Sequence, residues 1–229
     1  MDESTWLSCT DPQVMLEFLR GNASDRKLRL FAVACSWRSG LVSKHEKETE
    51  CLRVSEEWVD GNVSDDQLRD SYEQGGMKHS SHNLLINAPE KIAYWAAATD
   101  AKVAAHLTVV TPEIQQRLDE SGAMFSWDFD IPVCRAAAEK EQHMQADSLR
   151  EIFGSLPFRV VTANPTWLTS TVVTLAQSIY DNRRFEDMPI LADALEDAGC
   201  GNAEMLEHAR SGGEHVRGCW LVDLLLQKE

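Results

Sequence analysis

The sequence DMPILADALEDAGCGNAEMLEHARSGGEHVRGCWLVDLLLQKE, residues 187–229, decides the fold that we expect for this chain. It predicts three short helices joined by tight turns. The first spans 189–197, because apolar residues recur there at helical spacing and Gly199 suits the left-handed position after a helix end. The second begins after Asn202, a residue type that caps helices well. The third is expected over 216–226. Together they predict a compact unit that closes the fold.

Four side chains with metal-binding chemistry lie close together in this stretch. They are Cys200, His208, His215 and Cys219, with the spacing C-x7-H-x6-H-x3-C. Two thiolates and two imidazoles form a legitimate tetrahedral ligand set for zinc. His215 and Cys219 are four residues apart, so on a helix both lie on one face. We expect the tight turns to bring the four residues near one another, although the spacing differs from the usual zinc-finger patterns.

Two other interpretations of the same residues stay open. In the first, the cysteines are small buried hydrophobic residues, the histidines form local hydrogen bonds, and the glycines serve only the turns. The sequence favours this structural interpretation over zinc. In the second, Cys219 is a thiol nucleophile, His215 is its base, and Asp223 orients the base. A thiol in the middle of an apolar helix is normally unreactive, which argues against the second interpretation.

The rest of the chain carries many helix start and stop signals, which predict an all-α fold. A capping residue is followed by proline at 11–12 and again at 111–112. Ser64 and Gln67 form a capping box. Further helices are expected at 24–39, 43–60, 89–110, 132–153 and 168–180. In total we expect an irregular bundle of about ten helices.

Residues 155–167 contain two prolines and no helical period. We expect them to form an extended linker that crosses the bundle. The linker divides the chain into an N-terminal helical region, 1–154, and a C-terminal helical region, 155–229, which should pack together around one continuous core. The core residues expected from the apolar helix faces are Phe31, Cys35, Trp58, Trp95, Trp167, Leu195 and Trp220.

The composition limits the classes of partner. The chain has 229 residues and a formal net charge of −15. Such an acidic chain is not expected to bind nucleic acid or an anionic membrane, because both need clustered Lys and Arg. No apolar run is long enough to span a bilayer, and the acidic N-terminus lacks the apolar segment of a signal peptide. The six cysteines are scattered, which is typical of a cytoplasmic protein with free thiols.

Several long segments resemble a large family of uncharacterised bacterial proteins that is abundant in planctomycetes. They are DPQVMLEFLRGNASDRKLRLFAVAC (11–35), LREIFGSLPFRVV (149–161), PTWLTSTVVTLAQSIYDNRRFEDMPILADALEDAGC (165–200) and HVRGCWLVDLLLQKE (215–229). Between 40 and 148 only AYWAAATDAKVAAH (93–106) is similar. The resemblance implies helical architecture and a bacterial origin. It transfers no activity, substrate or site residue.

The sequence contains none of the common nucleotide-binding, metalloprotease, calcium-loop or serine-hydrolase motifs. This favours a protein without catalytic activity. We therefore predict a cytoplasmic helical interaction or scaffold protein that binds a protein partner and needs no cofactor. The alternative is a zinc-binding protein built on the C-terminal Cys/His set. The lesser alternative is a thiol-dependent enzyme.

Overall fold

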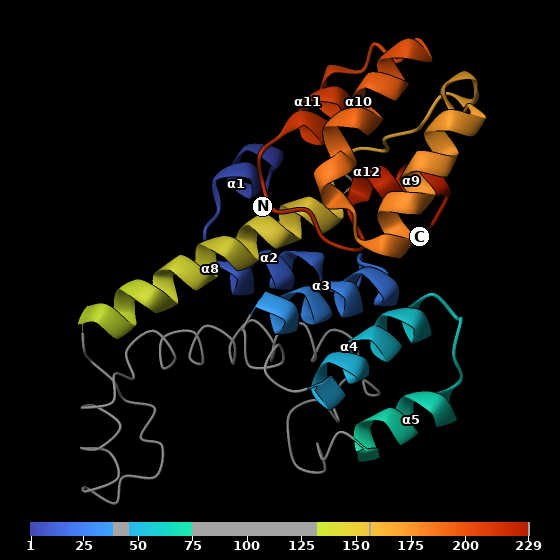
Figure 1. Cartoon of the computed structure of the whole chain (residues 1–229). Coiled ribbons are helices and arrows are strands. Elements are labelled where there is room, and N and C mark those ends of the chain that lie inside the picture. The colour runs from blue at the N-terminus through green and yellow to red at the C-terminus, as the bar shows by residue number, and fades with distance from the viewer. Residues whose placement is uncertain (39–45, 75–131, 156, 229) are drawn as a thin grey trace, which may run out of the picture.

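The structure, a computed structural model, describes residues 1–38, 46–74, 132–155 and 157–228 (Figure 1). Within these ranges the fold is all-α, with ten α-helices, two short 3-10 helices and no strand. The predicted fold class is therefore confirmed. The helices predicted around 89–110 and after 111–112 lie outside the described residues.

Five helices come from the N-terminal part of the chain. They are α1 (Glu3–Ser8), α2 (Pro12–Leu19), α3 (Asp25–Arg38), α4 (Glu46–Val59) and α5 (Asp65–Gln74). The capping box at α5 is confirmed, because Ser64 and Gln67 each accept the other's backbone N–H. Helix α1 was not predicted from the sequence. It is six residues long and buries only Trp6, so it has no room for a repeating apolar pattern.

The remaining described helices come from the C-terminal part. They are α8 (Pro132–Phe153), η3 (Pro165–Trp167), α9 (Ser170–Asn182), η4 (Phe185–Asp187), α10 (Met188–Asp197), α11 (Ala203–Arg210) and α12 (Trp220–Leu226). Helix α8 contacts α2, α3 and α12. In Figure 1 it runs between α2 and α3 on one side and the unit formed by α9 to α12 on the other. The predicted linker is irregular apart from η3.

The third predicted C-terminal helix is shorter than expected. It begins at Trp220 rather than at 216. The cause is Gly218, whose φ of +96° lies in the left-handed region and cannot continue a helix. A Cβ atom at this position would lie 2.8 Å from the Leu30 side chain. A glycine is therefore required where the chain passes α3, and 215–219 form a loop instead of a helical turn.

Buried apolar residues form three clusters. One is built from the C-terminal helices and includes Leu195 and Trp220. The second joins α1, α2 and α3 to α8, and Phe158 and Val216 from beyond residue 155 pack against it. The third lies between α3, α4 and α5. The division of the chain at residue 155 stays a prediction.

The predicted core residues are only partly correct. Phe31, Cys35, Leu195 and Trp220 are buried, whereas Trp58 and Trp167 are half-buried. The Trp58 ring lies under the Arg29 guanidinium at 4.6 Å, and its indole N–H donates to Asp65. Trp58 thus covers the rim of a cluster while its polar edge reaches solvent-exposed groups. Trp95 lies outside the described residues.

A buried charge network joins α3 and the end of α4 to the C-terminal helices. At its centre is Asp60, whose side chain is 2% exposed. Its carboxylate accepts hydrogen bonds from the Tyr180 hydroxyl at 2.5 Å, Arg26 Nε at 3.0 Å and an Arg217 nitrogen at 2.8 Å. Arg26 also binds both carboxylate oxygens of Asp223, at 2.6 and 3.2 Å. Buried charges need matched partners, so this network helps to fix how the two parts of the chain meet.

We expect acid to weaken the fold through Asp60. Burial raises the pKa of this carboxyl group, but the hydrogen bond from Tyr180 and the charge of Arg26 outweigh burial and hold the pKa below the ordinary value of 3.8. The unfolded chain therefore binds more protons between the two values. The stabilisation from Asp60 is complete above its ordinary pKa and is lost as the pH falls through its folded pKa.

The measurement is chemical denaturation at a series of pH values, from near neutral down to about pH 3. Asp60→Asn should show a shallower loss of unfolding free energy below the ordinary pKa of aspartate than the parent protein. Equal slopes for the two proteins would contradict the assignment to Asp60.

Candidate metal centre

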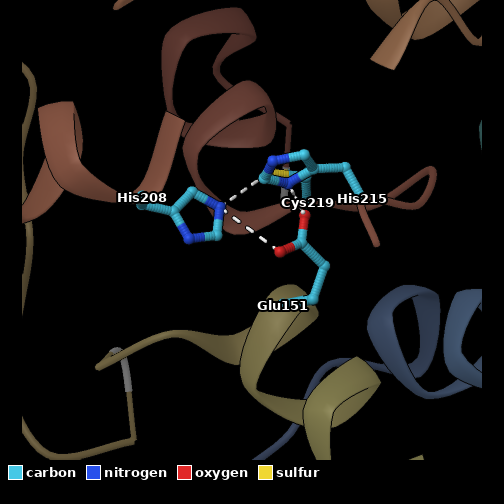
Figure 2. Close-up of side chains that lie close together, drawn as sticks. All are labelled: Glu151, His208, His215 and Cys219. Carbon is cyan, nitrogen blue, oxygen red and sulfur yellow. Dashed lines mark hydrogen bonds and ion pairs between the residues drawn. The ribbon is translucent and has the colours of Figure 1, made fainter. Parts of the chain in front are cut away.

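Four side chains from three separate segments converge beside the end of α8. They are Glu151, His208, His215 and Cys219 (Figure 2). One potential ligand atom from each residue lies within 4.8 Å of all the others. The structure therefore brings together three members of the set predicted from sequence and adds a carboxylate.

Local structure positions each of the four. Glu151 lies in the last turn of α8 and directs its carboxylate at the histidines. His208 lies in the last turn of α11. His215 belongs to the loop that follows, and Cys219 is the residue immediately before α12. Because Gly218 interrupts the helix, His215 and Cys219 are not one helical turn apart as the sequence predicted.

The distances between the polar atoms are short. His208 Nε2 lies 3.2 Å from Cys219 Sγ and 3.4 Å from Glu151 Oε2. His215 Nδ1 lies 2.9 Å from Glu151 Oε1. Ligands of a tetrahedral zinc ion, with bonds of about 2.0–2.3 Å, lie roughly 3.3–3.6 Å from one another. The first two distances are near that range, the third is shorter, and no two of the four ligand atoms are more than 4.8 Å apart.

The group is almost fully enclosed. The exposed fraction of the side chain is 16% for His208, 8% for Glu151 and 5% for His215, and Cys219 is fully buried. The ring of Trp220 packs against His208 with 4.9 Å between ring centroids. A cavity of about 460 Å³ borders the group on the side of Glu151 and His208. The cavity thus opens onto two of the four residues, while the Trp220 ring covers another side of His208.

The environment shifts the pKa values of His208, His215 and Cys219, the three titratable neighbours of Glu151, in different directions. Burial lowers the pKa of His208, and the nearby Glu151 charge only partly opposes it. Burial also lowers the pKa of His215, but its hydrogen bond to Glu151 and the charge of that carboxylate outweigh burial and raise it. Burial raises the pKa of Cys219 well above its ordinary value, and the Glu151 charge adds to the effect. Without a cation, the group therefore favours a thiol and a His215–Glu151 ion pair.

Cys200, the fourth residue predicted from sequence, does not belong to this group. It lies in the C-terminal apolar cluster. Its backbone N–H donates to Leu195 O at 2.9 Å, and the N–H of Gly199 donates to Glu196 O at 2.9 Å. This pair of bonds is the glycine-dependent helix ending known as a Schellman motif, in which the residue after the glycine packs back on the helix. The turn thus directs Cys200 into the core.

Glu151 was not predicted as a site residue. It is more than fifty positions before His208 in the chain, and on its own it is one of several carboxylates along α8. Its role depends on how α8 packs against the C-terminal loop. No local sequence signal marks that contact.

The arrangement predicted for a thiol nucleophile is not the one found. The carboxylate of Asp223 is bound by Arg26 rather than directed at His215, and His215 is bonded to Glu151. The partner of Cys219 is His208. A fully buried thiol with a raised pKa is normally unreactive. The geometry therefore gives less support to thiol chemistry than to metal binding.

In comparisons with protein families, curated proteins and solved structures, none matches this chain. The resemblance to planctomycete proteins stays a prediction. In the described part of the chain, no helix combines the length and the apolar character needed to cross a bilayer.

Proposed function

We propose that this chain is a zinc-binding helical protein whose centre consists of Glu151, His208, His215 and Cys219. One observation carries the proposal. A single nitrogen, Nε2 of His208, lies within 3.4 Å of both a thiol sulfur and a carboxylate oxygen. An imidazole nitrogen makes one well-directed hydrogen bond in the plane of its ring. A nitrogen, a sulfur and an oxygen atom that could each bind a metal thus lie around one point, which is the arrangement found around a shared cation.

The charges of the four groups support a divalent ion. A carboxylate, a thiolate and two neutral imidazoles carry two negative charges, which Zn²⁺ balances. Charge balance matters here, because an uncompensated charge in an enclosed site is costly. Calcium and magnesium prefer oxygen ligands, whereas a mixed set of nitrogen, sulfur and oxygen is typical of zinc.

The number of ligands supports a structural ion. Catalytic zinc usually has three protein ligands and an open position, while structural zinc has four. All four ligands here come from the protein, and they connect α8 to α11 and to the start of α12. The proposed ion would therefore hold the C-terminal unit against the long helix. The predicted interaction or scaffold role and the protein partner stay predictions.

The metal content of protein purified without a metal-affinity tag tests the proposal. We expect about one zinc per chain, because the centre has four ligands for one ion. Cobalt substituted into the site should show the visible bands of tetrahedral Co²⁺ and a thiolate charge-transfer band. Cys219→Ala and His208→Ala should lose the metal. Cys200→Ala removes a thiol that lies in the same stretch of sequence but outside the group. This variant should keep the metal.

A chelator provides the second test. If zinc binds the folded chain and not the unfolded one, removing it lowers the melting temperature, since a ligand at a hundred times its Kd stabilises the fold by about 2.7 kcal/mol. The chelator should leave the melting temperature of Cys219→Ala unchanged. A parent protein that melts at the same temperature with and without chelator, and contains no metal, would falsify the proposal.

The cytoplasmic location is part of the same proposal. Cys9, Cys35, Cys51, Cys200 and Cys219 carry free thiols. Free thiols are typical of a reducing compartment, in which a thiolate is also available as a metal ligand.

A further inference from the structure

A second pocket is lined in part by Trp220 and uses none of the four proposed metal ligands. Its volume is about 600 Å³, which falls in the range of about 300–1,000 Å³ that is usual for small-molecule sites. The end of α2, the start of α3, the end of α8 and α12 all contribute to it. Its apolar walls include the rings of Phe18, Phe153 and Trp220.

One of the polar residues that line this pocket is Lys27. This residue is 8% exposed, and its ammonium group donates a hydrogen bond to the carbonyl oxygen of Ile152 at 2.6 Å. The nearest carboxylate, that of Asp223, lies 4.0 Å away. An ammonium group has three N–H donors. Within the described residues, Lys27 therefore has donors that lack a partner at hydrogen-bond distance, and it lines a pocket with space beside it.

The charges around the pocket favour an anion. Asp223 is the one carboxylate among the described lining residues, and Arg26 already binds both of its oxygens. A second lysine, Lys228, also lines the pocket, and its ammonium group pairs with the Asp60 carboxylate at 3.5 Å. Burial lowers the pKa of Lys27, and the charge of Asp223 offsets this only in part, as expected for a cation without a full counter-charge.

We propose that this pocket binds a small monocarboxylate with a flat apolar body, whose carboxylate accepts hydrogen bonds from Lys27. The aromatic walls match a flat apolar group, which gains affinity by leaving water. A phosphate is usually held by arginine or by a run of backbone N–H groups, and no arginine is among the described residues that line the pocket. The proposal does not depend on the metal centre.

The test is a ligand-observed NMR titration with phenylacetate and with phenylacetamide, which has the same ring and no charge. We expect phenylacetate to bind more tightly. Lys27→Met keeps the apolar stem and removes the ammonium group. It should raise the Kd for phenylacetate by about 10- to 100-fold, the range expected from losing a hydrogen bond to a charged group. It should leave the Kd for phenylacetamide unchanged.

Two further variants keep the test decisive. Lys140→Met removes an exposed lysine of α8 and should leave both affinities unchanged. Leu224→Trp adds volume at the pocket wall and should abolish binding of both compounds, which provides an answer if Lys27→Met does not fold. Equal affinities for the two compounds, an unchanged Kd for phenylacetate in Lys27→Met, or no binding of phenylacetate would each overturn the proposal. Titrations repeated in chelator should give the same Kd values.

Discussion

Asp60→Ala is expected to lower the free energy of unfolding by about 3–5 kcal/mol, the usual cost of removing one partner from a buried charge network. The carboxylate accepts hydrogen bonds from Tyr180, Arg26 and Arg217. Without it, two guanidinium groups and a hydroxyl lose their common acceptor in an enclosed site. The remaining positive charges of Arg26 and Arg217 then face each other with less compensation. Urea denaturation followed by circular dichroism measures the loss.

Asp66→Ala is the matched control for this prediction. Asp66 also pairs with an arginine, at 2.8 Å from Arg69, but the two side chains are 83% and 57% exposed. Exposed ion pairs contribute about 0–1 kcal/mol. The control should therefore be close to the parent protein in stability. Similar losses in the two variants would show that burial of the network does not determine its contribution.

The helices of this protein could be predicted because their signals are local. The capping box of Ser64 and Gln67 needs only residues within one turn of each other, and both of its hydrogen bonds are present. Gly199 after α10 was likewise predicted as a helix end, and its φ is +85°. Such contacts are decided within a few residues, before any tertiary packing.

Where the predicted helix bounds are wrong, the cause is tertiary packing. Residues 215–219 have helical spacing, but Gly218 adopts a left-handed conformation where the chain passes Leu30 of α3. The close approach between these two residues, far apart in the chain, cannot be read from the residues around 218. The difference matters for the site, because His215 and Cys219 lie in a loop and not in a helix.

The candidate metal centre could be predicted in part, because three of its four residues are close together in the sequence. His208, His215 and Cys219 share a short stretch with tight turns, and that stretch marked them as neighbours. Glu151 comes from α8, and it joins them only because α8 packs beside the C-terminal unit. Cys200 was a plausible ligand by residue type, but the turn after α10 buries it among apolar residues. Residue type therefore indicated the metal-binding chemistry, while tertiary packing determined which residues belong to the centre.

Trp220→Ala should also cost about 3–5 kcal/mol, because it removes a large buried ring and leaves a cavity. Trp220 is 3% exposed. Its ring packs against the backbone of Gly154, where a Cβ atom would lie 2.7 Å from the ring, and against the ring of His208. The residue therefore fills the space between the end of α8 and the C-terminal helices. The surrounding backbone is held by three elements and is not expected to collapse into that space.

Trp167→Ala makes the same chemical change at a half-buried position on the same cluster, so its cost should be clearly smaller than that of Trp220→Ala. The denaturation of both variants should be measured in the presence of chelator. A cavity beside His208 can also weaken zinc binding, which would add a second loss of stability to the one caused by packing. Under these conditions the difference between the two variants measures packing alone. Equal losses would mean that Trp220 contributes no more than a rim residue. The contact between α8 and the C-terminal unit would then depend mainly on other contacts, such as the hydrogen bond between Glu151 and His215.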